Sequence, residues 1–180
     1  MSEGTGSEIP GSASIKKKLS FEQLQLFFSH ISEQYTLDEI TFVCIGTDRS
    51  TGDALGPLTG SKLLEYGFSR VIGTLPDPCD AISLAHKLGH IPPHHVIIAI
   101  DACLGQPSSV GSFFAAKGPL SPAKSVGSPL PEVGHYSIAA VVNVHGPKPY
   151  WTLQMTSLNF VMIMASQIAD AAASAFGLTP

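Results

Sequence analysis

The stretch at residues 41–57, TFVCIGTDRSTGDALGP, constrains the fold of this chain more than any other. Its apolar beginning at residues 42–45 is short, partly β-branched and closed by Gly46, a pattern typical of a buried strand. A polar loop follows, and Asp53 stands near its end, just before a predicted helix. Because ligands bind at the carboxyl ends of strands in open α/β sheets, Asp53 is a candidate site residue.

A second acidic residue follows a second predicted strand. Residues 96–100, VIIAI, form a continuous apolar run that ends directly on Asp101. Parallel strands end at the same edge of a sheet, so Asp53 and Asp101 are predicted to meet there. Two carboxylates held close together do not both ionise easily, and such a pair can share a proton and activate water. The structural alternative is that each aspartate caps a helix or a turn.

The rest of the chain alternates between predicted strands and helices. Strands are expected at 40–45, 71–75, 96–100, 111–117 and 138–144, and helices at 21–35, 55–66, 80–88 and 151–176. This alternation predicts an α/β protein, built as a three-layer α-β-α sandwich with a mainly parallel sheet. The segment 118–134 is rich in proline and glycine and too long for a simple connection, so we expect it to be functional or mobile.

The length and the charge content indicate one compact domain. The 180 residues fit a single domain at residues 19–180, after a tail at residues 1–18 that is expected to be disordered. Charged residues make up 13% of the chain and the net charge is -4, which argues against a nucleic-acid partner.

Cysteine usage and the polarity of the last helix bear on location and partners. Three scattered cysteines suit a reducing cytoplasm. The apolar segment 153–176 is interrupted by polar residues, so we expect a buried helix and no membrane partner. A homo-oligomer formed through that helix remains an open alternative.

Other residues near the two aspartates have competing roles. Asp48 is a further ligand or a turn-former, and Arg49 pairs with a carboxylate, binds a substrate carboxyl group or is simply exposed. Cys103 is a buried thiol, with a nucleophile as the alternative. Tyr150 and Trp151 are expected to anchor the last helix, with lining of the pocket as the alternative.

The segments IGTDRSTGDALGP and VIIAIDACLG together resemble the germination protease of spore-forming bacteria, an atypical aspartic peptidase. The catalytic aspartates of that family fall at the positions matching Asp53 and Asp101. Over residues 21–176 the chain also resembles the short YyaC-type sporulation proteins, which are related to that protease. The resemblance implies a sporulation-associated peptidase that acts on a protein or peptide in the cytoplasm of the forespore or mother cell. The alternative is a non-catalytic protein on the same fold that binds a peptide or a metal.

The same architecture is similar to the hydrogenase maturation endopeptidases, which implies a fold of that type, also described as phosphorylase-like. In that family two acids and a histidine bind nickel. The matching positions here are Asp53, Asp101 and His135, and two carboxylates with one imidazole form a reasonable set for a divalent metal. A hydrogen-bonded structural role is the alternative for His135. If the protein is an aspartic peptidase of the germination-protease type, no cofactor is expected.

Overall fold

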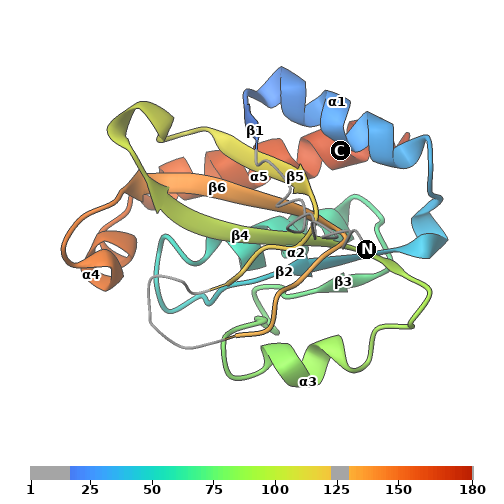
Figure 1. The fold of residues 1–180 in the computed structure, drawn as a ribbon, viewed down its shortest axis with the longest axis horizontal. Helices are drawn as coiled ribbons and strands as arrows, with labels where there is room; N and C mark the ends of the chain where they lie inside the picture. Colours follow the sequence, from blue (N-terminus) through green and yellow to red (C-terminus); the bar gives the residue numbers. More distant parts are fainter. Residues whose placement is uncertain (1–16, 123–129, 180) are drawn as a thin grey trace, which may run out of the picture.

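A six-stranded sheet forms the centre of the molecule (Figure 1). The computed structural model describes residues 17–122 and 130–179. The strands are β1 (Lys17–Leu19), β2 (Ile40–Cys44), β3 (Val71–Ile72), β4 (Val96–Gly105), β5 (Phe113–Lys117) and β6 (Tyr136–Val144). They lie in the order β1-β5-β6-β4-β2-β3, and β5 runs antiparallel to β1 and β6, whereas β6, β4, β2 and β3 are parallel. The predicted mainly parallel α/β sheet is confirmed.

Helices cover the two faces of the sheet unequally. The helices are α1 (Phe21–Ser32), α2 (Leu55–Glu65), α3 (Leu84–Leu88), α4 (Pro149–Gln154) and α5 (Leu158–Ala175), with short 3-10 turns at Leu37–Glu39 and Pro107–Ser109. In Figure 1, α1, α2 and α5 lie on one side of the sheet and α3 on the other. The larger core, around Phe28, Phe42 and Ile168, lies beneath the three helices, and a smaller core around Val43 and Leu84 lies beneath α3.

The strand order creates a crevice at the carboxyl ends of β2 and β4. From β2 the chain runs through α2 to β3 on one side, and then through α3 back to β4 on the other side of β2. At such a reversal the loops after the two central strands turn away from each other, which leaves room for a ligand. The fold therefore places a potential binding site beside Asp53 and Asp101.

The structure corrects several predicted boundaries. Lys17 and Lys18 were predicted to lie in a disordered tail, but they form β1 with Leu19 and pair with β5, where Leu19 is buried. The other residues of that tail, 1–16, lie outside the described residues. Cross-strand pairing and the burial of one apolar side chain are enough to order this short segment.

The predicted C-terminal helix is two helices. The chain leaves the helical conformation after α4, and the Ser157 hydroxyl accepts a hydrogen bond from the amide of Phe160 to begin α5. A serine at this position is a strong N-cap, so it starts a new helix in an otherwise apolar segment. The predicted strand at 71–75 shortens to β3, and the predicted helix at 80–88 becomes a turn followed by α3.

Helix α5 is long and apolar enough, by length and composition alone, to cross a membrane. In this fold Val161, Ile168 and Ala172 are completely buried in the larger core, where α5 packs beside α1 and α2. It is therefore a core helix, as its interrupting polar residues predict.

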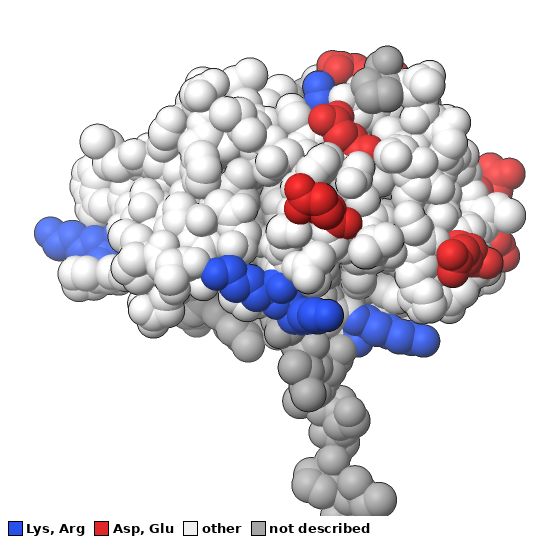
Figure 2. Space-filling view, turned by 90° about the horizontal axis from the view of Figure 1, so that it is seen from above, with Lys and Arg blue, Asp and Glu red and all other residues white. Residues whose placement is uncertain are grey.

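Charged side chains are few on the face seen in Figure 2, where broad neutral areas separate them.

Candidate active site

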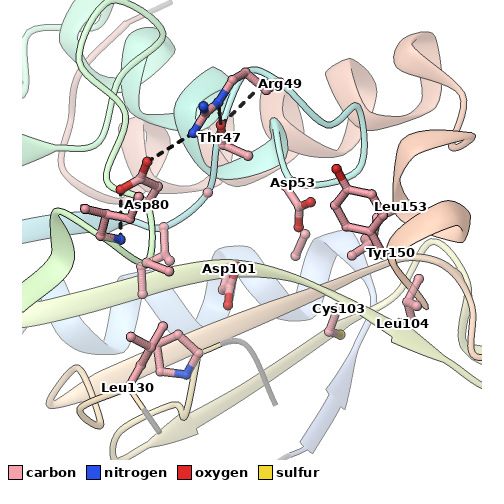
Figure 3. A pocket seen from close by; sticks show the side chains of 16 residues that line it. Thr47, Arg49, Asp53, Asp80, Asp101, Cys103, Leu104, Leu130, Tyr150 and Leu153 are labelled. Carbon is pink, nitrogen blue, oxygen red and sulfur yellow. Dashed lines mark hydrogen bonds and ion pairs between the residues drawn. The ribbon is translucent and has the colours of Figure 1, made fainter. Parts of the chain in front are cut away.

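A pocket of about 270 Å³ opens in the crevice between β2 and β4 (Figure 3). Asp53 and Asp101 both line it, from the loop after β2 and from β4 respectively, so the structure brings together the two predicted carboxylates. The remaining lining comes from five parts of the chain: Ile45, Gly46, Thr47 and Arg49; Asp80, Ala81 and Ile82; Ala102, Cys103 and Leu104; Pro122 and Leu130; Tyr150 and Leu153.

Close backbone packing fixes the loop that carries Asp53. The amide of Thr47 donates to the carbonyl oxygen of Asp53 at 3.2 Å. A Cβ added at Gly46 would lie 2.0 Å from that same carbonyl oxygen, and one at Gly56 would lie 2.0 Å from the carbonyl oxygen of Ile45. Glycine is therefore needed at both positions so that the two ends of the loop can approach each other.

Burial makes Asp53 a weak acid. It raises the pKa of the Asp53 carboxyl above its ordinary value, because the ionised form loses hydration in the pocket. The nearby hydroxyl of Ser50 opposes this rise, although that buried hydroxyl makes no hydrogen bond of normal geometry among the described residues. The effect of burial is the larger of the two, so the neutral form of Asp53 is favoured over a wider pH range than that of an exposed aspartate.

Asp101 lies within a strand rather than after one. The predicted strand ends at Ile100, but β4 continues to Gly105 because β6 pairs with it as far as Val144. Strand β2 has ended by this level, since its last paired residue is Cys44, opposite Ile100. Asp101 is therefore the first residue of β4 beyond the end of β2, which is why its side chain reaches the pocket.

A third acid in the pocket, Asp80, is held by hydrogen bonds. Its Oδ1 accepts from the amides of Ile82 and Ser83 at 3.1 and 2.9 Å, and from the Ser83 hydroxyl at 2.9 Å. Its Oδ2 lies 3.6 Å from the guanidinium of Arg49. These donors, led by the Ser83 amide, lower the pKa of Asp80 below its ordinary value. Arg49 thus pairs with a carboxylate, one of its predicted roles, and the dashed line between Arg49 and Asp80 in Figure 3 marks this pair.

The three cysteines differ in their surroundings. Cys44 and Cys79 are completely buried, and burial raises the pKa of both thiols, to about 11 for Cys79. Cys103 is half-buried and lines the pocket beside Asp101. Its predicted place in the core is therefore wrong, because residue 103 lies on the part of β4 that extends past β2.

His135 lies away from the two aspartates. Its Nδ1 accepts a hydrogen bond from the amide of Ile97, near the start of β4, at 2.9 Å. Asp101 is four positions further along β4 than Ile97, about 13 Å along an extended strand. Among residues 17–122 and 130–179, no three His, Cys, Asp or Glu side chains lie close enough to hold a metal ion. The set of Asp53, Asp101 and His135 is therefore not assembled, and His135 has the structural role given as its alternative.

Two aromatic residues also depart from their preferred prediction. Tyr150 and Trp151 were expected to anchor the last helix, but both are more than half exposed, and Tyr150 lines the pocket. Asp48 is exposed and does not line the pocket.

Two residues that line the pocket, Asp80 and Leu153, were not predicted from the sequence to be site residues. A signal existed for Asp80, because it follows the strand at residues 71–75 and so approaches the same edge of the sheet as Asp53.

Comparison with known proteins identifies the family. Residues 12–171 match the family model described as "Protein of unknown function (DUF1256)". The chain belongs to this family. It is 46% identical over 154 residues to the "Uncharacterized protein YyaC" of Bacillus subtilis (strain 168). The aligned region covers 83% of this chain and 75% of that protein.

Solved structures share the fold of this DUF1256 protein. The [NiFe] hydrogenase maturation protease HycI from Thermococcus kodakarensis KOD1 aligns with a TM-score of 0.57 and 15% identity, over 84% of this chain and 99% of HycI. HybD, a [NiFe] hydrogenase maturation protease from Thermococcus kodakarensis, aligns with a TM-score of 0.48 and 14% identity, over 76% of this chain and 97% of HybD. The alignment with HycI shows that the fold is that of the hydrogenase maturation proteases.

Proposed function

We propose that this protein is an aspartic-type peptidase, related to the spore germination protease, that cleaves a protein or peptide with Asp53 and Asp101. The observation that carries the proposal is that two acids of a protease-like fold, one from the loop after β2 and one from β4, line one pocket. Their sequence motifs, which resemble those of the germination protease, point to the same pair.

In this proposal the two acids have different roles: Asp101 is the general base and Asp53 is the general acid. Asp101 as the carboxylate accepts a proton from water, whose oxygen attacks the carbonyl carbon of the peptide bond. Asp53 stays neutral more readily because burial raises its pKa, so it donates its proton toward the carbonyl oxygen. The tetrahedral intermediate then collapses: the proton on Asp101 passes to the leaving nitrogen as the C–N bond breaks, and one hydroxyl proton of the intermediate returns to Asp53, which leaves a carboxylic acid and an amine. No metal ion is needed for this cycle, so cleavage is expected to persist in a chelator.

The test compares aspartate variants on a defined substrate pool. Wild type, Asp53→Asn and Asp101→Asn are incubated with synthetic decapeptides, and the products are identified by mass spectrometry. Each variant is expected to lose activity by roughly 10²- to 10⁴-fold while it keeps a cooperative melting transition. Asp48→Asn is the matched control, because that acid is in the same loop but exposed and outside the pocket. Full cleavage by both pocket variants would contradict the proposal, and binding without cleavage by wild type would favour a non-catalytic peptide-binding protein.

The biological setting is also part of the proposal. The resemblance to the germination protease and to YyaC-type proteins supports a role in sporulation, in the cytoplasm of the forespore or mother cell. A fluorescent fusion expressed from the native promoter in a spore-forming host is expected to appear in one of these compartments after sporulation begins. Constant expression during growth, with no change at sporulation, would count against this setting.

A further inference from the structure

Strand β4 has two halves with different neighbours. Residues 96–100 pair with β2 on one side, as far as Ile100 opposite Cys44. Beyond this level β4 continues for five residues and pairs with β6 on the other side, up to Gly105 opposite Val144. Residues 98–100 are buried, whereas residues 101–105 are only half-buried. The second half of β4 therefore has an edge where β2 no longer covers it.

The hydrogen bonds show which residues present their backbone at this edge. The carbonyl oxygen of Ile100 accepts from the amide of Ile45, on the β2 side, at 2.7 Å. The carbonyl oxygens of Ile97 and Gly105 accept from residues 135 and 145, on the β6 side. Because the two sides alternate along a strand, Ala102 and Leu104 turn their amides and carbonyls toward the β2 side. Among the described residues, no backbone hydrogen bond links either of them to the loop after β2.

The pocket lies along this edge. Its lining includes four consecutive residues of β4, from 101 to 104. Consecutive side chains point to opposite faces of a sheet. Ala102 and Leu104 pack against the larger core on the helix-rich face, so Asp101 and Cys103 point to the face that α3 covers. A single pocket touches side chains of both faces only where it borders the strand's edge.

We propose that the substrate of the hydrolysis proposed above binds as an added β-strand on β4, hydrogen-bonded to the backbone of Ala102 and Leu104. An unpaired strand edge is a template for another extended chain, and main-chain hydrogen bonds supply affinity in this binding mode. The added strand continues the line of β2 beyond its end. The backbone of the added strand therefore passes beside Asp101 and next to the loop that carries Asp53.

The walls of the pocket define the side chains of such a strand. Alternate residues of the added strand point to the two faces of the sheet. On the helix-rich face they meet Leu104 and Leu153. On the other face they meet Leu130, at the rim of the smaller core. Both walls are mainly apolar, so the substrate class is an extended polypeptide segment with apolar side chains on both faces.

Amide hydrogen exchange of the free protein tests the open edge without any ligand. The amides of Ala102 and Leu104 are expected to exchange on the order of 100-fold faster than those of Ile98 and Ile100, which face β2. All four belong to the same strand, so the comparison controls for its overall stability. Equal protection of Ala102 and Ile100 would overturn the proposal, because the edge would then already be paired.

A peptide pool tests the occupant. The probe is a set of acetylated, amidated decapeptides with Val, Ile, Leu or Tyr at alternate positions, added to Asp53→Asn so that binding is observed without turnover. The tightest peptide is expected to slow exchange at Ala102 and Leu104. Methylation of a peptide nitrogen that bonds to β4 is expected to weaken binding roughly tenfold, and methylation of the next nitrogen to have little effect. No protection by any peptide, or no alternation in the methyl scan, would overturn the added strand.

The outcomes separate this inference from the proposed function. Protection at Ala102 and Leu104 without cleavage by wild type supports strand addition and contradicts peptidase activity. Cleavage that depends on Asp53 and Asp101, without protection or alternation, supports the peptidase and overturns strand addition. If a second copy of this chain protects the edge instead, protection rises with protein concentration, and this result also overturns the proposal.

Discussion

Asp53 and Asp80 line the same pocket, but different parts of the structure hold them in place. Asp53 is positioned by its backbone, because Gly46 and Gly56 allow the two ends of its loop to touch. Asp80 is positioned by its own carboxylate, which accepts three hydrogen bonds at the start of the turn before α3 and pairs with Arg49. The pKa of Asp53 is raised and that of Asp80 is lowered.

This difference indicates which acid is suited to exchange protons. A carboxylate that is surrounded by donors is stabilised as an anion and is a poor proton carrier. A carboxyl that a rigid backbone holds in a buried place, with few donors, stays ready to give and take a proton. Asp80 therefore supports the architecture of the pocket, whereas Asp53 is free for chemistry.

The largest effect is expected from Gly46→Ala. The new Cβ would meet the carbonyl oxygen of Asp53 at 2.0 Å, at a backbone φ of +149° that side chains rarely adopt. We expect a loss of about 3 kcal/mol in the free energy of unfolding, measured by denaturant titration. Gly89→Ala is the control, since its nearest neighbour would be 3.4 Å away, and it should change stability by less than about 0.5 kcal/mol. Equal stability of Gly46→Ala and wild type would show that the backbone does not fix Asp53.

An intermediate effect is expected from Asp80→Ala. This change leaves the amides of Ile82 and Ser83 without their acceptor, at a cost of about 1–2 kcal/mol. The melting temperature should therefore fall by a few degrees, because each kcal/mol of lost stability lowers it by about 2–4 °C in a protein of this size. Arg49→Gln is the matched control, because it removes the ion pair of an exposed arginine and its long hydrogen bond to the Thr47 hydroxyl, at 3.4 Å, but keeps the hydrogen bonds to Asp80; it should cost less than about 1 kcal/mol. If the two variants melted alike, the hydrogen bonds would not be what holds Asp80.

The smallest effect is the pH dependence of Asp53→Asn. Because the folded pKa is raised, the ionised carboxyl destabilises the fold above its ordinary pKa of 3.8, and this cost is complete above the folded pKa. Asp53→Asn removes that cost, so it should melt above wild type at pH 7. The gap should close as the pH falls toward 3.8.

Asp80 is expected to show the opposite sign. The lowered pKa stabilises the fold above 3.8, and this contribution is lost as the pH falls through the folded pKa. The penalty of Asp80→Ala should therefore shrink in acid. Melting curves of both variants and of Asp48→Asn between pH 3 and 8 check these signs. Equal pH profiles for the Asp53 and Asp80 variants would contradict the comparison.

Much of the fold follows from local patterns in the sequence. Short apolar runs closed by glycine or an acid predict β2 and β4, and the capping box of Ser20 with Gln23 begins α1 where predicted. The misplaced boundaries depend on distant partners. Residues 101–105 have no clear strand pattern, and they are extended because β6 pairs with them. Likewise, β1 is ordered by its pairing with β5 and by the burial of Leu19.

The candidate site was predictable in part for the same reason. Asp53 and Asp101 each follow a recognisable apolar run, so their meeting at one edge of the sheet follows from the rule for parallel strands. His135 failed as a partner because its distance from Asp101 depends on register, which the sequence does not reveal. Tyr150, which lines the pocket, belongs to α4, and the apolar pattern of the segment hides the break that separates α4 from α5.

The unequal placement of the three thiols has a practical consequence. A maleimide reacts with an accessible thiolate. Cys44 and Cys79 are expected to react slowly in the folded protein, because both are completely buried and burial raises the pKa of both thiols. The native protein therefore carries a natural reporter position at Cys103, on the strand that borders the pocket. A fluorophore attached there would register occupancy of the pocket without any engineered residue.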